Sequence, residues 1–488
     1  MATRRPQMNG TDAEHADIVS EPTLDPVVAR RSRAMSNVRS LFPIAPTSRV
    51  RWRSALSALF FIGFGTFLEV QRLGGNTAVD TLWAEDGNIF LAGAVNGGRL
   101  HAFLVTYNGY VNSAARLIGA LAASFPLSWA AATFAIGSAS TVALLGGFVY
   151  RASGAHIPTK QVRFMLAALM VIMPATAFEV QDNAANLHWF FDFAAVWALL
   201  WRPSNWWDRS LGVVVILLAA TSDPLVAILV PLALLRLLAV PKQEIGPVLA
   251  LLGGLLIQAV AFVDPAQVVL AGPAQGTPSP LDLARVFGVH VLTSFFLGGT
   301  LGNDLFGAFG YKLVGLLTLV ALAGLVCLML RKSLQFERRL VLGLSALAIA
   351  FTIIPVYIRW GSQFDINPYH LIGVPARYWT VPLLCLWAAV AVVVGSQRFR
   401  DLVRPSVGMA AIGALSVWFV VLALSDYGIH NMYRDVGPFW NQEMAAAITF
   451  CESARTGSNA TFLPPPKLVF GFNIPCSRVV SPPANREH

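Results

Sequence analysis

The chain has 488 residues, of which 56% are hydrophobic and only 12% are charged, and its mean hydropathy is +0.61. Soluble domains are usually about a quarter charged, so this composition excludes an ordinary water-soluble protein and predicts an integral membrane protein. The formal net charge is +9, but the basic residues fall between apolar runs and do not line one soluble face. This placement fits a membrane surface and argues against a nucleic-acid partner.

The N-terminal residues 1–53 are polar and end in a basic cluster, Arg49, Arg51 and Arg53. This composition predicts a disordered, basic cytoplasmic tail. The first apolar run, 54–70, begins too far from Met1 for a signal peptide, so we predict a retained first span. Its basic flank predicts a cytoplasmic N-terminus.

About ten further apolar stretches predict an all-α polytopic membrane domain over 54–424 with about eleven transmembrane helices. Several stretches are shorter than the roughly 20 residues of a straight spanning helix, which leaves tilted or re-entrant segments as alternatives. The further stretches lie near 128–150, 163–177, 189–201, 211–221, 225–240, 247–263, 312–330, 340–358, 381–394 and 409–424.

Lys and Arg gather in every second connection, as expected of a chain whose N-terminus lies in the cytoplasm. The largest such cluster comprises Arg331, Lys332, Arg338 and Arg339. An odd number of spans then places residues 425–488 outside as a small extracytoplasmic tail. We therefore predict a multi-pass protein of the plasma (inner) membrane.

Three predicted outer segments, 71–126, 264–310 and 359–378, are too long to be simple connectors. Loops of this length usually carry function or are disordered. Within the segment 71–126, called the first long loop below, residues 88–100 and 111–124 have partial helical spacing of apolar residues. This spacing predicts short helices in the membrane interface.

Two of the four cysteines, Cys451 and Cys476, lie in the polar C-terminal segment, and the sequence has no zinc-type spacing of Cys and His. In an extracytoplasmic tail the pair either forms a disulfide or stays reduced. A disulfide would close a loop of roughly two dozen residues and contribute about 3 kcal/mol.

The first candidate site is the run Trp83, Ala84, Glu85, Asp86 and Gly87 in the first long loop. In an apolar, interfacial setting one of two adjacent acids can have a raised pKa and act as a general base. Its neighbour can then position a hydroxyl or bind a cation. The alternative is a solvated turn beside a glycine.

A second group of polar residues lies at the outer ends of later spans, where ionisable side chains that face a bundle interior commonly serve function. We select Asp182 and His188 as candidate substrate-binding residues, and Asp192 lies nearby. Asp223 precedes Pro224 and is explained equally well as the end of a helix. For His188 the alternative is a hydrogen-bonded packing residue.

The third group lies in 359–378, where outer-face arginines oppose the inward bias of basic residues. Arg359 and Arg377 carry the forked donors that suit phosphate, so either can hold a lipid-linked phosphate. A salt bridge to Asp365 or snorkelling to lipid headgroups is the structural alternative. His370 and Tyr378 complete this group of candidate substrate-binding residues.

With these motifs in view, the chain resembles the GT-C superfamily of membrane glycosyltransferases that use polyprenyl-phosphate sugars. Such enzymes have many spans and a long first outer loop with an acidic motif and interfacial helices. The resemblance covers about 53–424 in architecture. The matching motifs are short: the acidic run at 83–87, and Ala376, Arg377 and Tyr378 followed by Pro382.

The resemblance implies that Asp86 or Glu85 is the general base for an acceptor hydroxyl and that Arg377 holds the donor phosphate. The implied partners are a polyprenyl-phosphate sugar donor, membrane lipid and an extracytoplasmic glycan, lipid or protein acceptor in cell-envelope biosynthesis. No cofactor or metal is required, although paired acids accept a divalent cation. The chain departs from the superfamily in having no clear second acidic motif and no large soluble C-terminal domain.

Two other functions share these features. A transporter or flippase of lipid-linked glycans would also carry many spans and charged residues, but its site should lie near the midplane on broken helices. A glycan polymerase would need a long outer loop with several arginines, and 264–310 contains only Arg285. A membrane scaffold whose charges satisfy one another is the last alternative.

Overall fold

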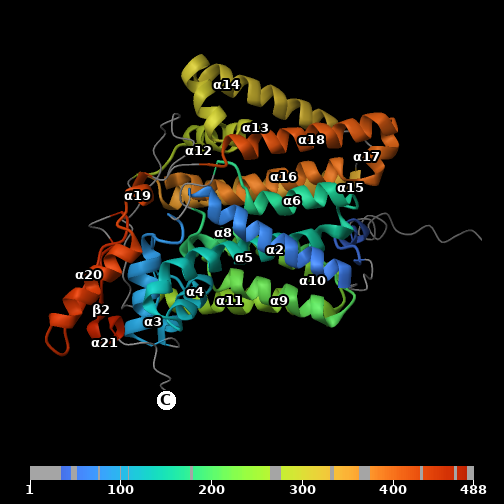
Figure 1. Cartoon of the computed structure of the whole chain (residues 1–488). Coiled ribbons are helices and arrows are strands. Elements are labelled where there is room, and N and C mark those ends of the chain that lie inside the picture. Colours follow the sequence, from blue (N-terminus) through green and yellow to red (C-terminus); the bar gives the residue numbers. More distant parts are fainter. Residues whose placement is uncertain are drawn as a thin grey trace, which may run out of the picture.

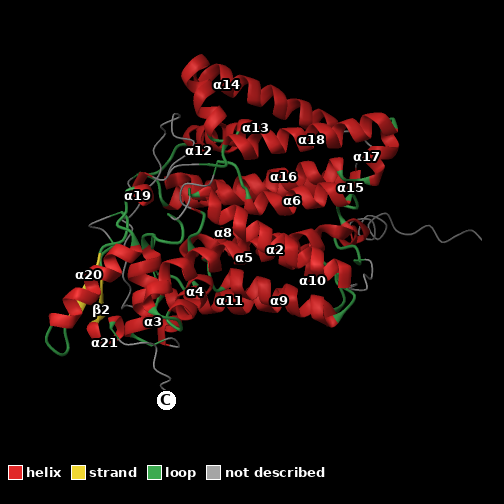
Figure 2. Ribbon diagram, viewed as in Figure 1, coloured by secondary structure: helices red, strands yellow, loops and turns green. Residues whose placement is uncertain are grey.

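The computed structural model of the chain describes residues 35–45, 52–74, 77–98, 101–107, 109–175, 180–263, 276–329, 335–361, 374–428, 432–466 and 470–480. These residues are mostly helical, and the long helices run side by side as one elongated bundle (Figure 1). Two short strands, β1 (Asn459–Phe462) and β2 (Phe472–Pro475), pair antiparallel near the C-terminus (Figure 2).

Within the described ranges, six helical segments are long and apolar enough to cross a membrane. The chain is therefore a multi-pass helical membrane protein, whereas the count of about eleven spans is not confirmed. The six segments are Leu127–Ala155, Pro280–Leu297, Thr300–Cys327, Glu337–Ile358, Ala376–Val394 and Pro405–Ser425. Shorter apolar helices cover Ser113–Ala122, Ala184–Leu200, Pro224–Ala239 and Gly246–Phe262.

Two helices form the centre of the bundle. Every residue of α8 (Leu187–Leu200) is buried, and so is nearly every residue of α16 (Thr380–Val394). A helix that is hydrophobic on nearly every face lies either in a protein core or against lipid, and here protein neighbours cover it. For α8 these neighbours include α5 (Ala130–Ala152), α9 (Trp206–Ala220) and α16, and α15 (Gln335–Ile358) packs along α16.

Helices α2 and α5 approach each other through small residues. Gly65 of α2 (Trp52–Arg72) faces α5, where an added Cβ would lie 3.2 Å from the Cβ of Ala143. Small residues at helix contacts allow the close backbone approach typical of membrane helices. The remaining bundle helices are α6 (Lys160–Val171), α10 (Val230–Ala239), α11 (Gly246–Phe262), α14 (Thr300–Met329) and α18 (Pro405–Ser425), with α17 (Gln397–Leu402) between α16 and α18.

Residues 264–275 of the predicted outer segment 264–310 lie outside the described residues, and the rest of the segment is mostly helical where a loop is predicted. From Pro280 the chain is continuously helical through α12 (Pro280–Val286), the π-helical turn η8 (Phe287–Leu292) and α13 (Thr293–Leu297). It is one of the six candidate spans. Asp282, Arg285 and His290 interrupt its apolar sequence, and the π-helical turn breaks the 3.6-residue period that marks a helix.

The N-terminal tail also differs in part from its prediction as disordered over 1–53. Residues 35–45 begin with a short helix, and Phe42 is buried in the core. Ile44 forms a β-bridge with Arg202, between α8 and α9. This part of the tail is ordered because an apolar side chain anchors it to the bundle.

The first long loop is helical where its apolar spacing predicts. It contains η1 (Asp86–Leu91), α3 (Ala92–Asn96), η2 (His101–Leu104) and α4 (Ser113–Ala122). Asn112 caps α4 by accepting a hydrogen bond from the backbone N–H of Ala115. Below, the end of the bundle that carries this loop is called the loop end.

The described C-terminal residues 432–466 and 470–480, called the C-terminal cap, lie at the loop end. Figure 1 shows α20 (Trp440–Ser453), β2 and α21 (Cys476–Val479) beside α3 and α4. The backbone N–H of Ala84 donates to the Pro465 carbonyl (2.9 Å), and the N–H of Trp440 donates to the Asp80 carbonyl (2.6 Å). Loop and cap therefore lie on the same side of the bundle.

A disulfide between Cys451 and Cys476 joins α20 to α21, and the two cysteines are 25 residues apart in sequence. A closed loop of this length contributes about 3 kcal/mol. We expect Cys451→Ser to loosen the cap and to speed its removal by protease in detergent several-fold. Cys327→Ser removes an exposed free thiol on α14 and is the matched control. Equal proteolysis of both variants would refute this role for the disulfide.

Candidate functional site

The two acids of the predicted motif have different surroundings. Asp86 is completely buried, and its two carboxylate oxygens accept the backbone N–H groups of Ala184 and Ala185, both at 3.0 Å. These donors belong to η5 (Ala184–Asn186), the turn that leads into α8. Ala84, just before the acids, has a left-handed backbone with φ of 45°. Asp86 therefore ties the first long loop to the start of the central helix.

The pKa of Asp86 is raised to about 7, mainly by burial and to a smaller extent by the charge of Glu85. The two backbone donors and Arg434 lower this pKa but do not cancel the effect of burial. Arg434 comes from α19 (Met432–Asp435) in the C-terminal cap and is itself buried. Its guanidinium lies 5.7 Å from the centre of the Trp83 ring. The cap thus supplies positive charge beside the acidic motif.

Glu85 is only partly buried. Its Oε1 accepts a hydrogen bond of 2.7 Å from the Tyr107 hydroxyl. Tyr107 and Tyr110 form a tight turn in which each backbone N–H donates to the other's carbonyl, at 2.8 and 3.0 Å. Burial, followed by the charge of Glu85, raises the pKa of Tyr107 well above its ordinary value, so the phenol stays protonated as a donor.

Arg377 lies in η10 (Val374–Trp379), directly before α16. Its guanidinium is 5.1 Å from the centre of the Tyr378 ring, and it interacts electrostatically with Tyr107 and Tyr110. Glu85 interacts with the same two tyrosines. The predicted acid and the predicted arginine therefore act electrostatically on the same two tyrosines, although nearly 300 residues separate them in sequence.

Tyr378 extends this cluster towards α8. Its ring meets that of Trp189 edge-on at 5.3 Å, and Trp189 lies 4.3 Å from the ring of His188. His188 is buried, with Nδ1 2.6 Å from Oδ2 of Asp223. The predicted residues Tyr378 and His188 are thus linked through one aromatic side chain.

Asp182 belongs to a separate group. It is buried, has a φ of 50°, and accepts no hydrogen bond on its carboxylate from any described residue. Burial raises its pKa to about 7, and Arg434 and Arg72 lower it. Arg434 also donates to its backbone carbonyl at 3.3 Å. Asp182 therefore interacts with the charges of Arg434 and Arg72 and not with the Arg377 cluster.

Two predicted substrate-binding residues remain, His370 and Arg359. His370 lies outside the described residues. Arg359 directly follows α15 and is partly buried.

Sequence reasoning missed three contributors to this region: Tyr107, Tyr110 and Arg434. The two tyrosines flank Asn108 and Gly109, and an Asn-Gly pair is a strong turn signal that would have identified their pairing. Arg434 carries no comparable signal. It lies in a short polar stretch, and only the folding of the cap over the loop brings it to the acids.

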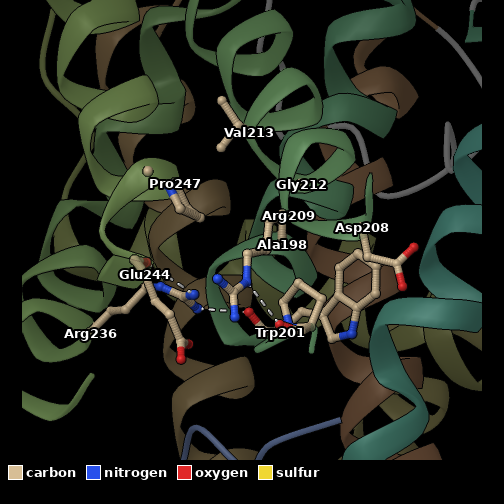
Figure 3. Close-up of a pocket in the computed structure, with 11 residues that line it drawn as sticks. Ala198, Trp201, Asp208, Arg209, Gly212, Val213, Arg236, Glu244 and Pro247 are labelled. Atoms are coloured by element: carbon tan, nitrogen blue, oxygen red, sulfur yellow. Dashed lines mark hydrogen bonds between the residues drawn. The ribbon is translucent and has the colours of Figure 1, made fainter. Parts of the chain in front are cut away.

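A separate small pocket lies away from these residues, between α8, α9 and the α10–α11 connection (Figure 3). Its charged groups are already paired: Glu244 accepts from Arg202 at 2.8 Å, and Arg236 donates to the Trp201 carbonyl at 2.9 Å. Asp208 pairs with Arg151 at 2.7 Å. These contacts hold the helix connections together, so we assign a structural role and no chemistry to this pocket.

No protein-family model matches the chain, and no curated protein matches it. Among solved structures, the chain is similar to the oligosaccharyltransferase of Archaeoglobus fulgidus, determined in complex with Zn and sulfate. The two share 14% sequence identity with a TM-score of 0.37, over 81% of this chain and 55% of that one. This chain thus spans little more than half the length of that structure, and the likeness is too low to carry any argument about the site.

Proposed function

We propose that the chain is a GT-C-type membrane glycosyltransferase that moves a sugar from a polyprenyl-phosphate donor to an extracytoplasmic glycan, lipid or protein acceptor. The observation that carries the proposal is that Glu85, which holds the Tyr107 hydroxyl, and Arg377 both interact electrostatically with Tyr107 and Tyr110 at the loop end. Glycosyl transfer from a phosphate needs a base and a cationic group, and in this proposal Glu85 and Arg377 supply them.

We assign the general base to Glu85 and a positioning role to Asp86. Glu85 is partly exposed and has one oxygen held by Tyr107, so the carboxylate is oriented and accessible. Asp86 is fully buried, and both its oxygens are engaged by backbone donors. A general base must come within hydrogen-bond reach of the proton that it removes, and this condition favours Glu85.

The proposed reaction is one displacement at the anomeric carbon. The acceptor oxygen attacks that carbon, and Glu85 takes the hydroxyl proton. The bond between the anomeric carbon and the phosphate oxygen breaks, and polyprenyl phosphate leaves with the electron pair. Arg377 stabilises the charge that develops on the leaving phosphate. Attack from the opposite face inverts the anomeric carbon.

The proposed topology follows the charge bias, with the N-terminus in the cytoplasm, the loop end outside and about eleven spans. The donor then occupies the outer leaflet, where Arg377, with Tyr378 and Arg359 as further donor-binding positions, meets its headgroup. The cap at the loop end limits access from water. Cell-envelope biosynthesis is the process that such a reaction would serve.

The test is transfer from a panel of radiolabelled polyprenyl-phosphate sugars to endogenous acceptors in membranes that express the protein. We expect Arg377→Ala to lower the rate by about 10²-fold, as for the loss of one stabilising donor at a developing anion. Arg377→Lys should recover part of the rate because it keeps the charge and loses the fork. Arg285→Ala, which removes an arginine whose side chain is 55% exposed, is the control.

Two results would overturn the assignment. One is wild-type membranes that transfer no label above a vector control with any donor. The other is an Arg377→Ala variant as active as wild type. Transport of a lipid-linked glycan would then become the leading function, and flipping of a labelled lipid in proteoliposomes would be measured next.

A further inference from the structure

Three ionisable side chains meet inside the bundle, beside the proposed site. His188 and Asp192 are four residues apart on α8, so both project from the same face of the helix. Asp223 reaches them from the turn before η6 (Pro224–Leu229). One potential ligand atom from each residue lies within 4.8 Å of the others, and all three residues are buried.

Asp192 is the unusual member of this trio. It is 0% exposed, and neither of its carboxylate oxygens accepts a hydrogen bond from a described residue unless a proton is shared with the neighbouring carboxyl of Asp223. Asp223, by contrast, accepts from the backbone N–H of Leu225 at 2.8 Å and contacts His188. An ionised carboxylate buried without a donor is strongly unfavourable, so Asp192 needs a cation or a proton.

We propose that His188, Asp192 and Asp223 bind one divalent transition-metal cation. Two carboxylates and one imidazole form a mixed oxygen and nitrogen donor set of the kind that holds Mn²⁺ or Zn²⁺. The cation replaces the proton between His188 and Asp223 and offsets the buried negative charge of Asp192. The backbone N–H of Leu225 holds Asp223 in place as the supporting contact of a metal ligand.

The trio is separate from the acids of the first long loop. Asp86 contacts the turn before α8, and Glu85 contacts Tyr107, so neither is a ligand here. The metal site nevertheless adjoins the Arg377 cluster. His188 packs on Trp189, which meets Tyr378, and Tyr110 interacts electrostatically with Asp223. A bound cation would therefore hold His188 in place and, through Trp189, the surface on which Tyr378 packs.

The experiment measures metal content directly and does not depend on sugar transfer. The full chain is expressed in medium supplemented with MnCl₂ and ZnCl₂, purified in detergent and analysed by mass spectrometry for both metals. We expect about one equivalent of one metal in wild type, and affinity at least ~10-fold lower in Asp192→Asn, which keeps the side-chain shape. Asp304→Asn, an exposed acid on α14, is the matched control.

A second measurement guards against misfolding of the variant. Adding the metal found in wild type to chelator-treated protein should raise the thermal midpoint of wild type and of Glu85→Gln, but not that of Asp192→Asn. Wild type without either metal and without a metal-dependent midpoint would overturn the proposal in favour of a proton shared by Asp192 and Asp223. Equal metal content in wild type and Asp192→Asn would also overturn it. A metal-loaded protein without transferase activity would refute only the proposed function.

Discussion

Replacing Glu85 with glutamine is expected to lower sugar transfer by about 10²- to 10⁴-fold, the range for loss of a general base. Glutamine keeps the size of the side chain, and its carbonyl oxygen still accepts the Tyr107 hydroxyl, but it cannot take the acceptor's proton. The measurement is the initial rate of transfer at matched protein level, with size-exclusion profiles in detergent to show that the variant is folded.

Glu452→Gln provides the matched control, because Glu452 is exposed on α20 and distant in sequence from the acidic motif. It should transfer sugar at the wild-type rate. Wild-type activity in Glu85→Gln would remove Glu85 from the mechanism. If Asp86→Asn alone were inactive and normally folded, the base would instead be Asp86.

Replacing Asp86 with alanine is expected to destabilise the protein by about 2 to 6 kcal/mol, since each buried backbone donor left without an acceptor costs about 1–3 kcal/mol. The two orphaned donors are the N–H groups of Ala184 and Ala185. The thermal midpoint in detergent measures this effect, with Asp304→Ala as an exposed control. An unchanged midpoint would show that the loop and the start of α8 are held by other contacts.

This loss of stability should depend on pH in a defined direction. The pKa of Asp86 is raised by burial from 3.8 to about 7, so the folded protein binds more protons than the unfolded chain between these values. Stability contributed by Asp86 therefore falls as pH rises from about 4 to 7. Asp86→Ala lacks this dependence, and its midpoint should lie further below wild type at pH 5 than at pH 8. The reverse order would contradict the raised pKa.

The general class of the protein was predictable from the sequence because apolar run length alone reports on membrane helices. The segment 280–297 was not, since Asp282, Arg285 and His290 interrupt its apolar pattern. Asp282 and Arg285 lie near the start of this helix, 3.8 Å apart, whereas His290 is buried by neighbours that the sequence does not identify. The order in 35–45 was missed for the same reason, because Phe42 finds its pocket only in the folded bundle.

The candidate site was predictable as a set of residue types but not as an arrangement. Short motifs directed attention to Glu85, Asp86 and Arg377. The division between the two acids depends on backbone N–H groups about 100 residues away, at Ala184 and Ala185, which no side-chain pattern records. The contact of His188 with Asp223 likewise links α8 to the turn before η6, and the sequence does not show that these two segments are close.

The packing of the C-terminal cap on the first long loop also governs when the site can form. A Cβ at Gly87 would lie only 2.7 Å from the Phe472 ring, so the cap closes against the loop where only a glycine fits. Ala84 donates to the Pro465 carbonyl in the same region. Chains emerge from the ribosome N-terminus first, so Gly87 is made 385 residues before Phe472, which covers it. Assembly of the acidic site is therefore one of the last events in the biogenesis of this protein.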